Sequence, residues 1–249
     1  QAAKIRFYRL IPQPKIRDFL LKPGSGSILQ DKQRGMPIVF RYGNDDAALS
    51  GAVWQCTEST EALGESLSLS PESRALLASF RSERRRREWL TVRRLLNELH
   101  PDQPAPEILY SGNGRPSLSD GSHISISHSE HYVTLCWSRS HRLGCDLESI
   151  RPQINRLAGK FVGSQEREFL GEHPSLEALH LVWGAKESLF KLYGSGGVDF
   201  RKELEVSSFQ IGESGTLRAA IRKTDFNLDT LIHYRFFDDM LLVYTAHPA

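Results

Sequence analysis

The chain has 249 residues, of which 39% are hydrophobic and 25% charged, as is usual for a globular protein. The formal net charge is only +2, which excludes a protein that binds polyanions over its whole surface. No apolar run approaches the roughly 18 residues that a membrane-spanning helix needs, and the first residues lack the apolar core of a signal peptide.

The three cysteines, Cys56, Cys136 and Cys145, have none of the spacings of a metal site. Because their number is odd, they cannot all pair within the chain as disulfides. We therefore expect reduced, buried cysteines in a protein of the cytoplasm, where thiols stay reduced.

Residues 1–47 give the least clear pattern, and we expect an extension there that includes one strand at residues 4–10. An apolar, β-prone run predicts a strand at residues 48–57. Helical periodicity then extends over residues 67–100 with one break. Ser70 is its expected N-cap, because a proline follows in the first helical position.

Strands separated by turns are expected over residues 107–137, and another strand follows a polar turn at 138–142. Residues 153–194 have a helical pattern that ends at Gly194. The remaining chain predicts antiparallel strands at 204–211, 216–223, 231–237 and 240–246.

A stretch of helix followed by strands thus occurs twice along the chain. This order predicts an α+β fold of two similar halves, each an antiparallel sheet plus helices, which meet near residue 140. The expected halves are residues 48–139 and 140–249.

Two carboxylates lie in the predicted strand "GCDLESI" at residues 144–150. Asp146 and Glu148 are two residues apart, so they share one face of the strand, while Cys145 and Leu147 point to the other. Two such carboxylates repel each other unless a cation lies between them, and Mg²⁺ is a suitable one. The alternative is a solvated sheet face with two surface acids.

In "WGAKESLFK" (183–191), helical spacing places Trp183, Glu187 and Lys191 on one face. The pattern suits an amphipathic helix with a surface ion pair. It also suits a site in which Glu187 completes a metal site and Lys191 binds a phosphate, with Lys186 as a second cation.

The strand "ISISHS" ends in Ser127 and His128. These are either loop residues or donors to a phosphate or ribose. No sequence typical of a nucleophilic serine surrounds Ser127. Arg115 lies in a glycine turn that either only connects two strands or holds this side chain rigidly.

The densest basic cluster lies in the helix expected at residues 82–94. Most of its arginines fall on a solvated face, but Arg85 falls on the apolar face beside Glu88, where an anion usually accompanies an arginine. The cluster also raises a different hypothesis, a nucleic-acid-binding protein that uses this helix.

Together these segments resemble the 4′-phosphopantetheinyl transferase superfamily, specifically its pseudo-dimeric, surfactin-synthetase-activating type. The resemblance covers about residues 48–249, and Cys145 and Gly184 depart from its pattern. The motifs that carry it are "GRP" (114–116), "ISISHS" (124–129), "LGCDLE" (143–148), "WGAKESLFK" (183–191) and the arginine helix (84–93).

The resemblance implies two halves related by a pseudo-twofold axis, with coenzyme A as co-substrate in the cleft between them. It implies Mg²⁺ held by Asp146, Glu148 and Glu187. The residues that it implies for coenzyme A are Arg85, Arg93, Arg115, Ser127, His128, Lys186 and Lys191.

The implied reaction transfers 4′-phosphopantetheine from coenzyme A to a serine of an apo acyl or peptidyl carrier protein, and adenosine 3′,5′-bisphosphate leaves. Glu187 would take the serine proton, directly or through water, and Lys191 would stabilise the leaving group, beside Asp146 on the metal. Because both halves are in one chain, we expect a monomer. We expect neither nucleic acid nor a membrane as a partner. A third possibility is an inactive adaptor for a carrier protein.

Overall fold

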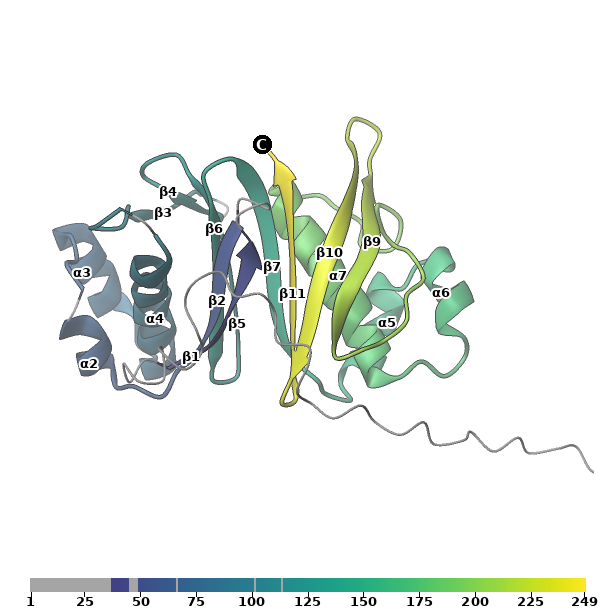
Figure 1. Ribbon diagram of the computed structural model, residues 1–249, viewed down its shortest axis with the longest axis horizontal. Coiled ribbons are helices and arrows are strands. Elements are labelled where there is room, and N and C mark those ends of the chain that lie inside the picture. Colours follow the sequence, from purple (N-terminus) through teal and green to yellow (C-terminus); the bar gives the residue numbers. More distant parts are fainter. Residues whose placement is uncertain (1–36, 45–48, 66, 101, 113) are drawn as a thin grey trace, which may run out of the picture.

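A computed structural model describes residues 37–44, 49–65, 67–100, 102–112 and 114–249. The described chain forms an antiparallel four-stranded sheet, an antiparallel five-stranded sheet and a two-stranded hairpin, with helices packed on the sheets (Figure 1). This arrangement confirms the expected α+β fold of antiparallel sheets and helices.

The four-stranded sheet has the order β1–β2–β6–β5. Its strands are β1 (Ile38–Asn44), β2 (Leu49–Gln55), β5 (His123–Ser129) and β6 (Tyr132–Ser138). The other elements before residue 123 are α2 (Thr60–Glu65), α3 (Pro71–Ser79), α4 (Glu83–Leu99), β3 (Ile108–Tyr110) and β4 (Pro116–Leu118). Helix α4 covers the sheet, because Trp89 and Leu95 share one buried core with Trp54 and Leu135.

The five-stranded sheet has the order β7–β11–β10–β9–β8. Its strands are β7 (His141–Ser149), β8 (Leu204–Val206), β9 (Ser214–Arg222), β10 (Asn227–Phe237) and β11 (Met240–Pro248). Its helices are α5 (Ile154–Phe161), α6 (Ser164–Leu170) and α7 (Leu176–Tyr193). Helix α7 lies on the sheet (Figure 1), and its apolar residues Leu181, Ala185 and Leu189 join a core with Leu241 and Val243.

The two sheets meet along β5 and β7. The Cys145 backbone amide donates to Ser125 Oγ at 3.0 Å. On the face of β7 away from α7, Leu147 packs with Phe40 and Leu242. This confirms that Cys145 and Leu147 point away from the face of Asp146 and Glu148.

Several local predictions are confirmed. Ser70 Oγ accepts from the Ser73 amide at 3.1 Å and caps α3. The break in the long helical stretch lies between α3 and α4, where Ser82 begins the second helix. Gly194 ends α7 with a left-handed φ of 74°, which glycine adopts without strain.

Other predictions need correction. Neither β1 nor α2 was expected from the sequence, whereas the helical pattern of residues 153–194 is divided among α5, α6 and α7. The strand expected over 204–211 stops at Val206. The strand expected at 4–10 lies outside the described residues. All three cysteines are free thiols, but Cys56 is only half-buried.

Candidate active site

The close contact between α7 and β7 builds the candidate site. A Cβ on Gly144 would lie 1.9 Å from the Ser188 carbonyl oxygen, so only glycine permits this approach. Helix residues four apart advance about 6 Å, and strand residues two apart advance about 6.6 Å. Side chains at these spacings therefore stay opposite one another along the contact.

Asp146 is the most enclosed carboxylate of the contact. Its Oδ1 accepts hydrogen bonds from Lys191 Nζ at 2.8 Å and from Ser127 Oγ at 2.9 Å. Its Oδ2 is buried and has no hydrogen-bond partner among the described residues. A buried oxygen without a partner is costly, so this atom can accept a further donor or a cation.

Lys191 also donates to the Cys145 carbonyl oxygen at 2.8 Å. Burial opposes its charge, but the Asp146 carboxylate outweighs that effect and raises the pKa of Lys191 above its usual value. The ammonium therefore stays charged beside Asp146. Lys191 thus lies on the carboxylate side of the strand, and its expected contact with a phosphate stays a prediction.

Glu148 and Glu187 are both partly buried beside Asp146. Burial, and then repulsion from Asp146, raises the pKa of Glu148 to about 8. The same two causes raise the pKa of Glu187 to about 7. The three carboxylates therefore act on one another, although Glu148 and Glu187 belong to different elements.

The structure lets us test whether these residues suit a metal ion. Among the residues that the structure describes, no three acidic, histidine or cysteine side chains are already arranged as metal ligands. Lys191 holds one oxygen of Asp146, and Trp183 Nε1 donates to Glu148 Oε1 at 3.1 Å. The unpartnered Asp146 Oδ2 and the mutual repulsion nevertheless fit a hard divalent cation, which prefers such oxygens. Metal binding stays a prediction.

Lys186 requires a correction. Its side chain is fully buried, and its Nζ contacts Glu166 Oε1 at 2.9 Å and donates to the carbonyl oxygens of Phe161 and Phe200, both at 2.8 Å. Three partners satisfy the three N–H groups of an ammonium. The expectation that Lys186 meets a pyrophosphate is therefore wrong for this structure.

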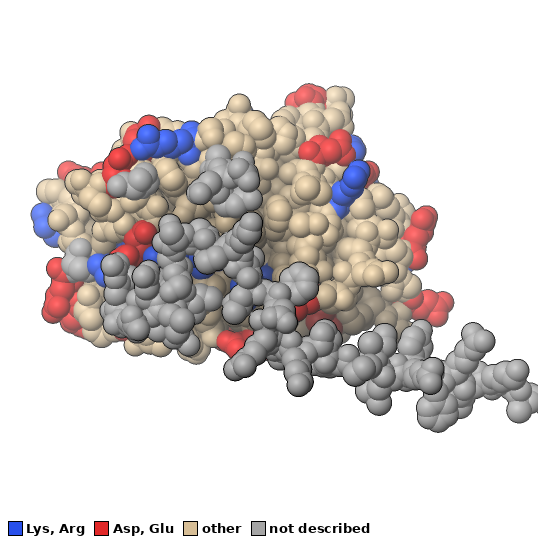
Figure 2. Space-filling view, in the orientation of Figure 1, with Lys and Arg blue, Asp and Glu red and all other residues tan. Residues whose placement is uncertain are grey.

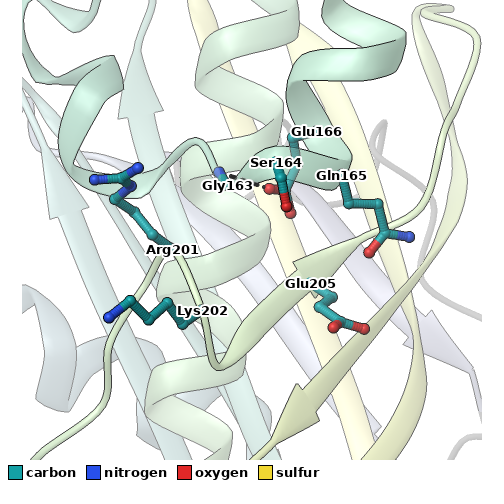
Figure 3. Close-up of a pocket in the computed structure, with 7 residues that line it drawn as sticks. All are labelled: Gly163, Ser164, Gln165, Glu166, Arg201, Lys202 and Glu205. Atoms are coloured by element: carbon teal, nitrogen blue, oxygen red, sulfur yellow. Dashed lines mark hydrogen bonds between the residues drawn. The ribbon is translucent and has the colours of Figure 1, made fainter.

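Glu166 is equally committed. Its Oε2 accepts from the Gly163 amide at 2.8 Å, and its Oε1 accepts from the Val206 amide at 2.9 Å. It lies at a surface hollow of about 380 Å³, where the side chains of Arg201 and Lys202 lie on the far side from Glu166 (Figure 3). The Lys186–Glu166 pair thus ties α6, α7 and β8 together.

The arginine helix contributes a second cluster. Glu88 is buried and accepts from Arg84 Nε at 2.8 Å, while His128 Nδ1 lies 3.6 Å from it. Arg85 also pairs with Glu88, at 3.7 Å, but 48% of its side chain is exposed. Arg85 therefore has the expected anion, but its side chain extends into solvent and is not buried with the apolar residues of α4, which corrects that prediction.

His128 is partly exposed at the end of β5. Burial lowers the pKa of its imidazole, although Glu88 acts in the opposite direction. Its neighbour Ser127 turns instead toward Asp146. Ser127 and His128 therefore connect the carboxylates of β7 with the arginine helix. Their contact with coenzyme A stays a prediction.

Arg93 and Arg115 have partners within the chain. The Arg93 guanidinium lies 3.2 Å from the centre of the Trp89 ring, and burial lowers its pKa to about 10. Arg115 Nη1 donates to the Gly194 carbonyl oxygen at 3.3 Å, and so joins the β3–β4 turn to the end of α7. Neither contact tests the expected role in coenzyme A binding.

The arginine run gives little additional support to the nucleic-acid hypothesis. Arg84 and Arg85 pair with Glu88, and Arg86 lies 3.8 Å from Glu83. On the face in Figure 2, basic and acidic side chains lie intermixed. None of the described helices is long and apolar enough to cross a membrane.

The sequence does not predict two residues, Glu88 and His180, as part of the candidate site. In the sequence Glu88 is only a neighbour of Arg85. His180 lies in no motif, yet it is buried on α7 with its Nδ1 4.0 Å from Glu148 Oε2. The available signal was its position three residues before Trp183, which places both side chains on one face of the helix.

The chain is similar to known proteins. A family model described as the 4′-phosphopantetheinyl transferase superfamily matches residues 142–243, the segment that contains the three carboxylates. A protein of Salmonella typhi named 4′-phosphopantetheinyl transferase AcpT is 32% identical over 170 residues, which are 63% of this chain and 79% of that protein.

A protein of the same name from Escherichia coli O157:H7 is 34% identical over 122 residues, or 44% of this chain. There the match spans 59% of the relative's length, less than two thirds. The Escherichia coli K12 protein of that name matches to the same extent.

Proposed function

Because the chain belongs to the 4′-phosphopantetheinyl transferase superfamily, we propose that it transfers 4′-phosphopantetheine from coenzyme A to a serine of an apo carrier protein. The serine oxygen bonds to the β-phosphorus of coenzyme A, and the bond from that phosphorus to the bridging oxygen breaks. The products are the holo-carrier and adenosine 3′,5′-bisphosphate, and the serine proton goes to a base.

The observation that supports this proposal most directly is the repulsion of Asp146 with Glu148 on β7 and with Glu187 on α7. Their carboxylates would hold Mg²⁺, which when bound would polarise the phosphoryl oxygens of coenzyme A. Burial raises the pKa of Glu187 to about 7, near the value that suits a general base at neutral pH.

Lys191 supplies the positive charge of the proposed site. Its ammonium lies against Asp146, and the raised pKa of Lys191 keeps it protonated at neutral pH. We propose that it stabilises the negative charge that develops on the leaving bisphosphate. In its 2.8 Å contact it also holds the Asp146 carboxylate in place.

We further propose the pseudo-dimeric arrangement, with halves at residues 48–139 and 140–249 and the coenzyme A cleft between them. The first proposed half contains α4 and three strands of the four-stranded sheet, to which β1 adds from the preceding residues, and the second half contains α7 and the five-stranded sheet. Arg85, Arg93, Arg115, Ser127 and His128 would bind the nucleotide end of coenzyme A. We also propose that the protein is a monomer of the cytoplasm. The three free thiols support this location, because thiols stay reduced in a reducing compartment.

Incubation with coenzyme A, Mg²⁺ and a panel of apo-carriers from fatty-acid, polyketide and peptide synthesis tests the proposal. Intact-mass spectrometry should show one carrier gaining a single phosphopantetheine group, and substitution of its acceptor serine by alanine should prevent the gain. If every carrier keeps its apo mass while a known transferase modifies the same panel, the proposed activity is wrong.

A further inference from the structure

His180 is a buried histidine that none of the recognised motifs contains. Its side chain is 5% exposed, and the Arg151 amide donates to its Nε2 at 3.0 Å. Since the amide hydrogen points at Nε2, a proton on this nitrogen would face another proton. The Arg151 carbonyl oxygen, 3.1 Å from Nε2, could accept a proton from this nitrogen, but the amide hydrogen of Arg151 would then still point at that proton. We therefore assign the proton of the neutral ring to Nδ1.

The Nδ1 atom is buried and has no hydrogen-bond partner among the described residues. Glu148 Oε2 lies 4.0 Å away, beyond hydrogen-bond length. Leaving a buried donor without an acceptor is destabilising. A small rotation of the Glu148 carboxylate would satisfy this donor, and therefore the two groups favour a shorter contact.

The other oxygen of Glu148 is already held by Trp183, whose indole N–H donates to Oε1 at 3.1 Å. The indole is itself fixed between aromatic rings, 5.2 Å from the centre of Phe161 and 5.5 Å from the centre of Phe200. One donor lets a carboxylate pivot about the contact, whereas a second donor on the other oxygen fixes its plane.

The charges at the two strand carboxylates differ. Asp146 is paired with the ammonium of Lys191, whereas the potential donors beside Glu148 are the neutral indole and, with the tautomer assigned above, a neutral imidazole. Neutral donors orient a carboxylate without cancelling its charge. A cation bound there would favour the ionised form of Glu148, and the donors on α7 would set the direction of its carboxylate without neutralising it.

We propose that His180 is a positioning residue, whose Nδ1–H acts with the Trp183 indole to hold the Glu148 carboxylate toward a divalent cation. The inference rests on the proposed function, because it takes Glu148 to be a metal ligand. Hydrogen-bond partners of metal ligands typically change metal affinity by about 10–100-fold when they are removed.

Two substitutions separate this role from a purely structural one. Asparagine places an amide N–H near the position of Nδ1, whereas glutamine places its amide near Nε2. His180→Asn therefore keeps the donor to Glu148 and loses the contact with Arg151. His180→Gln keeps the Arg151 contact and loses the donor to Glu148.

The test is a Mn²⁺ titration with saturating coenzyme A, followed by the electron paramagnetic resonance signal of free Mn²⁺. We expect His180→Gln and Trp183→Phe to raise the Mn²⁺ Kd by about 10–100-fold, and His180→Asn to stay within about threefold of the unsubstituted protein. Urea denaturation should show all three variants folded, and transfer by His180→Gln should recover at high Mg²⁺ as a KM effect.

The inference is overturned if His180→Gln binds Mn²⁺ as the unsubstituted protein does, or if His180→Asn loses as much affinity as His180→Gln. Absence of Mn²⁺ binding by the unsubstituted protein also overturns it. Failure of the proposed function looks different, because the Mn²⁺ affinities would then follow the expected order while no carrier gains mass.

Discussion

Replacing Lys186 by methionine tests whether this lysine is structural. The substitution keeps most of the length of the side chain but leaves the Glu166 carboxylate buried, with the Gly163 and Val206 amides as its remaining partners among the described residues. Breaking a buried ion pair by removing one partner costs about 3–5 kcal/mol, a large part of the roughly 5–15 kcal/mol that stabilises a typical domain.

The assay is urea denaturation followed by far-UV circular dichroism. With a denaturant slope of about 2–3 kcal/mol per molar, a loss of about 3–5 kcal/mol lowers the midpoint by about 1–2 M. The matched control is Lys202→Met, because the Lys202 side chain is 83% exposed and pairs with Asp199 only at 3.8 Å. Its expected change is below about 0.5 kcal/mol.

A second substitution checks the cause. Adding Glu166→Gln to Lys186→Met removes the unpaired charge, so the double variant should be more stable than Lys186→Met alone. The reasoning is refuted if Lys186→Met unfolds at the midpoint of the unsubstituted protein and instead raises the KM for coenzyme A. That result would restore Lys186 as a ligand of the pyrophosphate.

Two further predictions concern the helix contact and the response to pH. Gly144→Ala forces a Cβ against the Ser188 carbonyl and should lower the free energy of unfolding, measured by urea denaturation, by about 1–3 kcal/mol. The control is Gly159→Ala in α5, where a Cβ meets nothing within 4 Å, and it should stabilise the protein slightly. Equal urea midpoints for the two variants would refute the close contact. Burial beside Tyr244 lowers the pKa of His233 in the native state. Below the pKa of about 6.5 that a histidine has in the unfolded chain, the unfolded chain therefore binds a proton that the native state does not bind, and the free energy of unfolding decreases as the pH decreases. His233→Gln should lessen this acid-side loss, and identical pH profiles of unfolding free energy would contradict the assignment.

The sequence predicted best where local spacing determines geometry. Alternation in β7 placed Asp146 and Glu148 on one face, and the helical repeat placed Glu187 and Lys191 on another, so that only the contact of the two elements had to be added. Gly144 explains that contact, but its role depends on a helix carbonyl more than 40 residues away along the chain. No local pattern contains such information.

The failures have the same origin. Lys186 and Glu187 are neighbours on a helix, and sequence spacing alone could not tell which one faces the carboxylates and which one enters the core beside Glu166. Arg85 has a position on the apolar stripe of α4, yet a long side chain near a helix end can reach solvent while its pair with Glu88 persists. Residues 38–44 form a strand because they pair with β2. The composition of the segment does not reveal this pairing.

The central claim is that Glu187 acts with Asp146 and Glu148 in transfer to a carrier. Its most direct measurement is the rate of holo-carrier formation by Glu187→Gln, followed by intact mass against time at saturating coenzyme A and Mg²⁺. We predict a loss of roughly 100-fold or more with an unchanged urea midpoint. A folded Glu187→Gln protein that modifies the carrier at the unsubstituted rate would contradict the account.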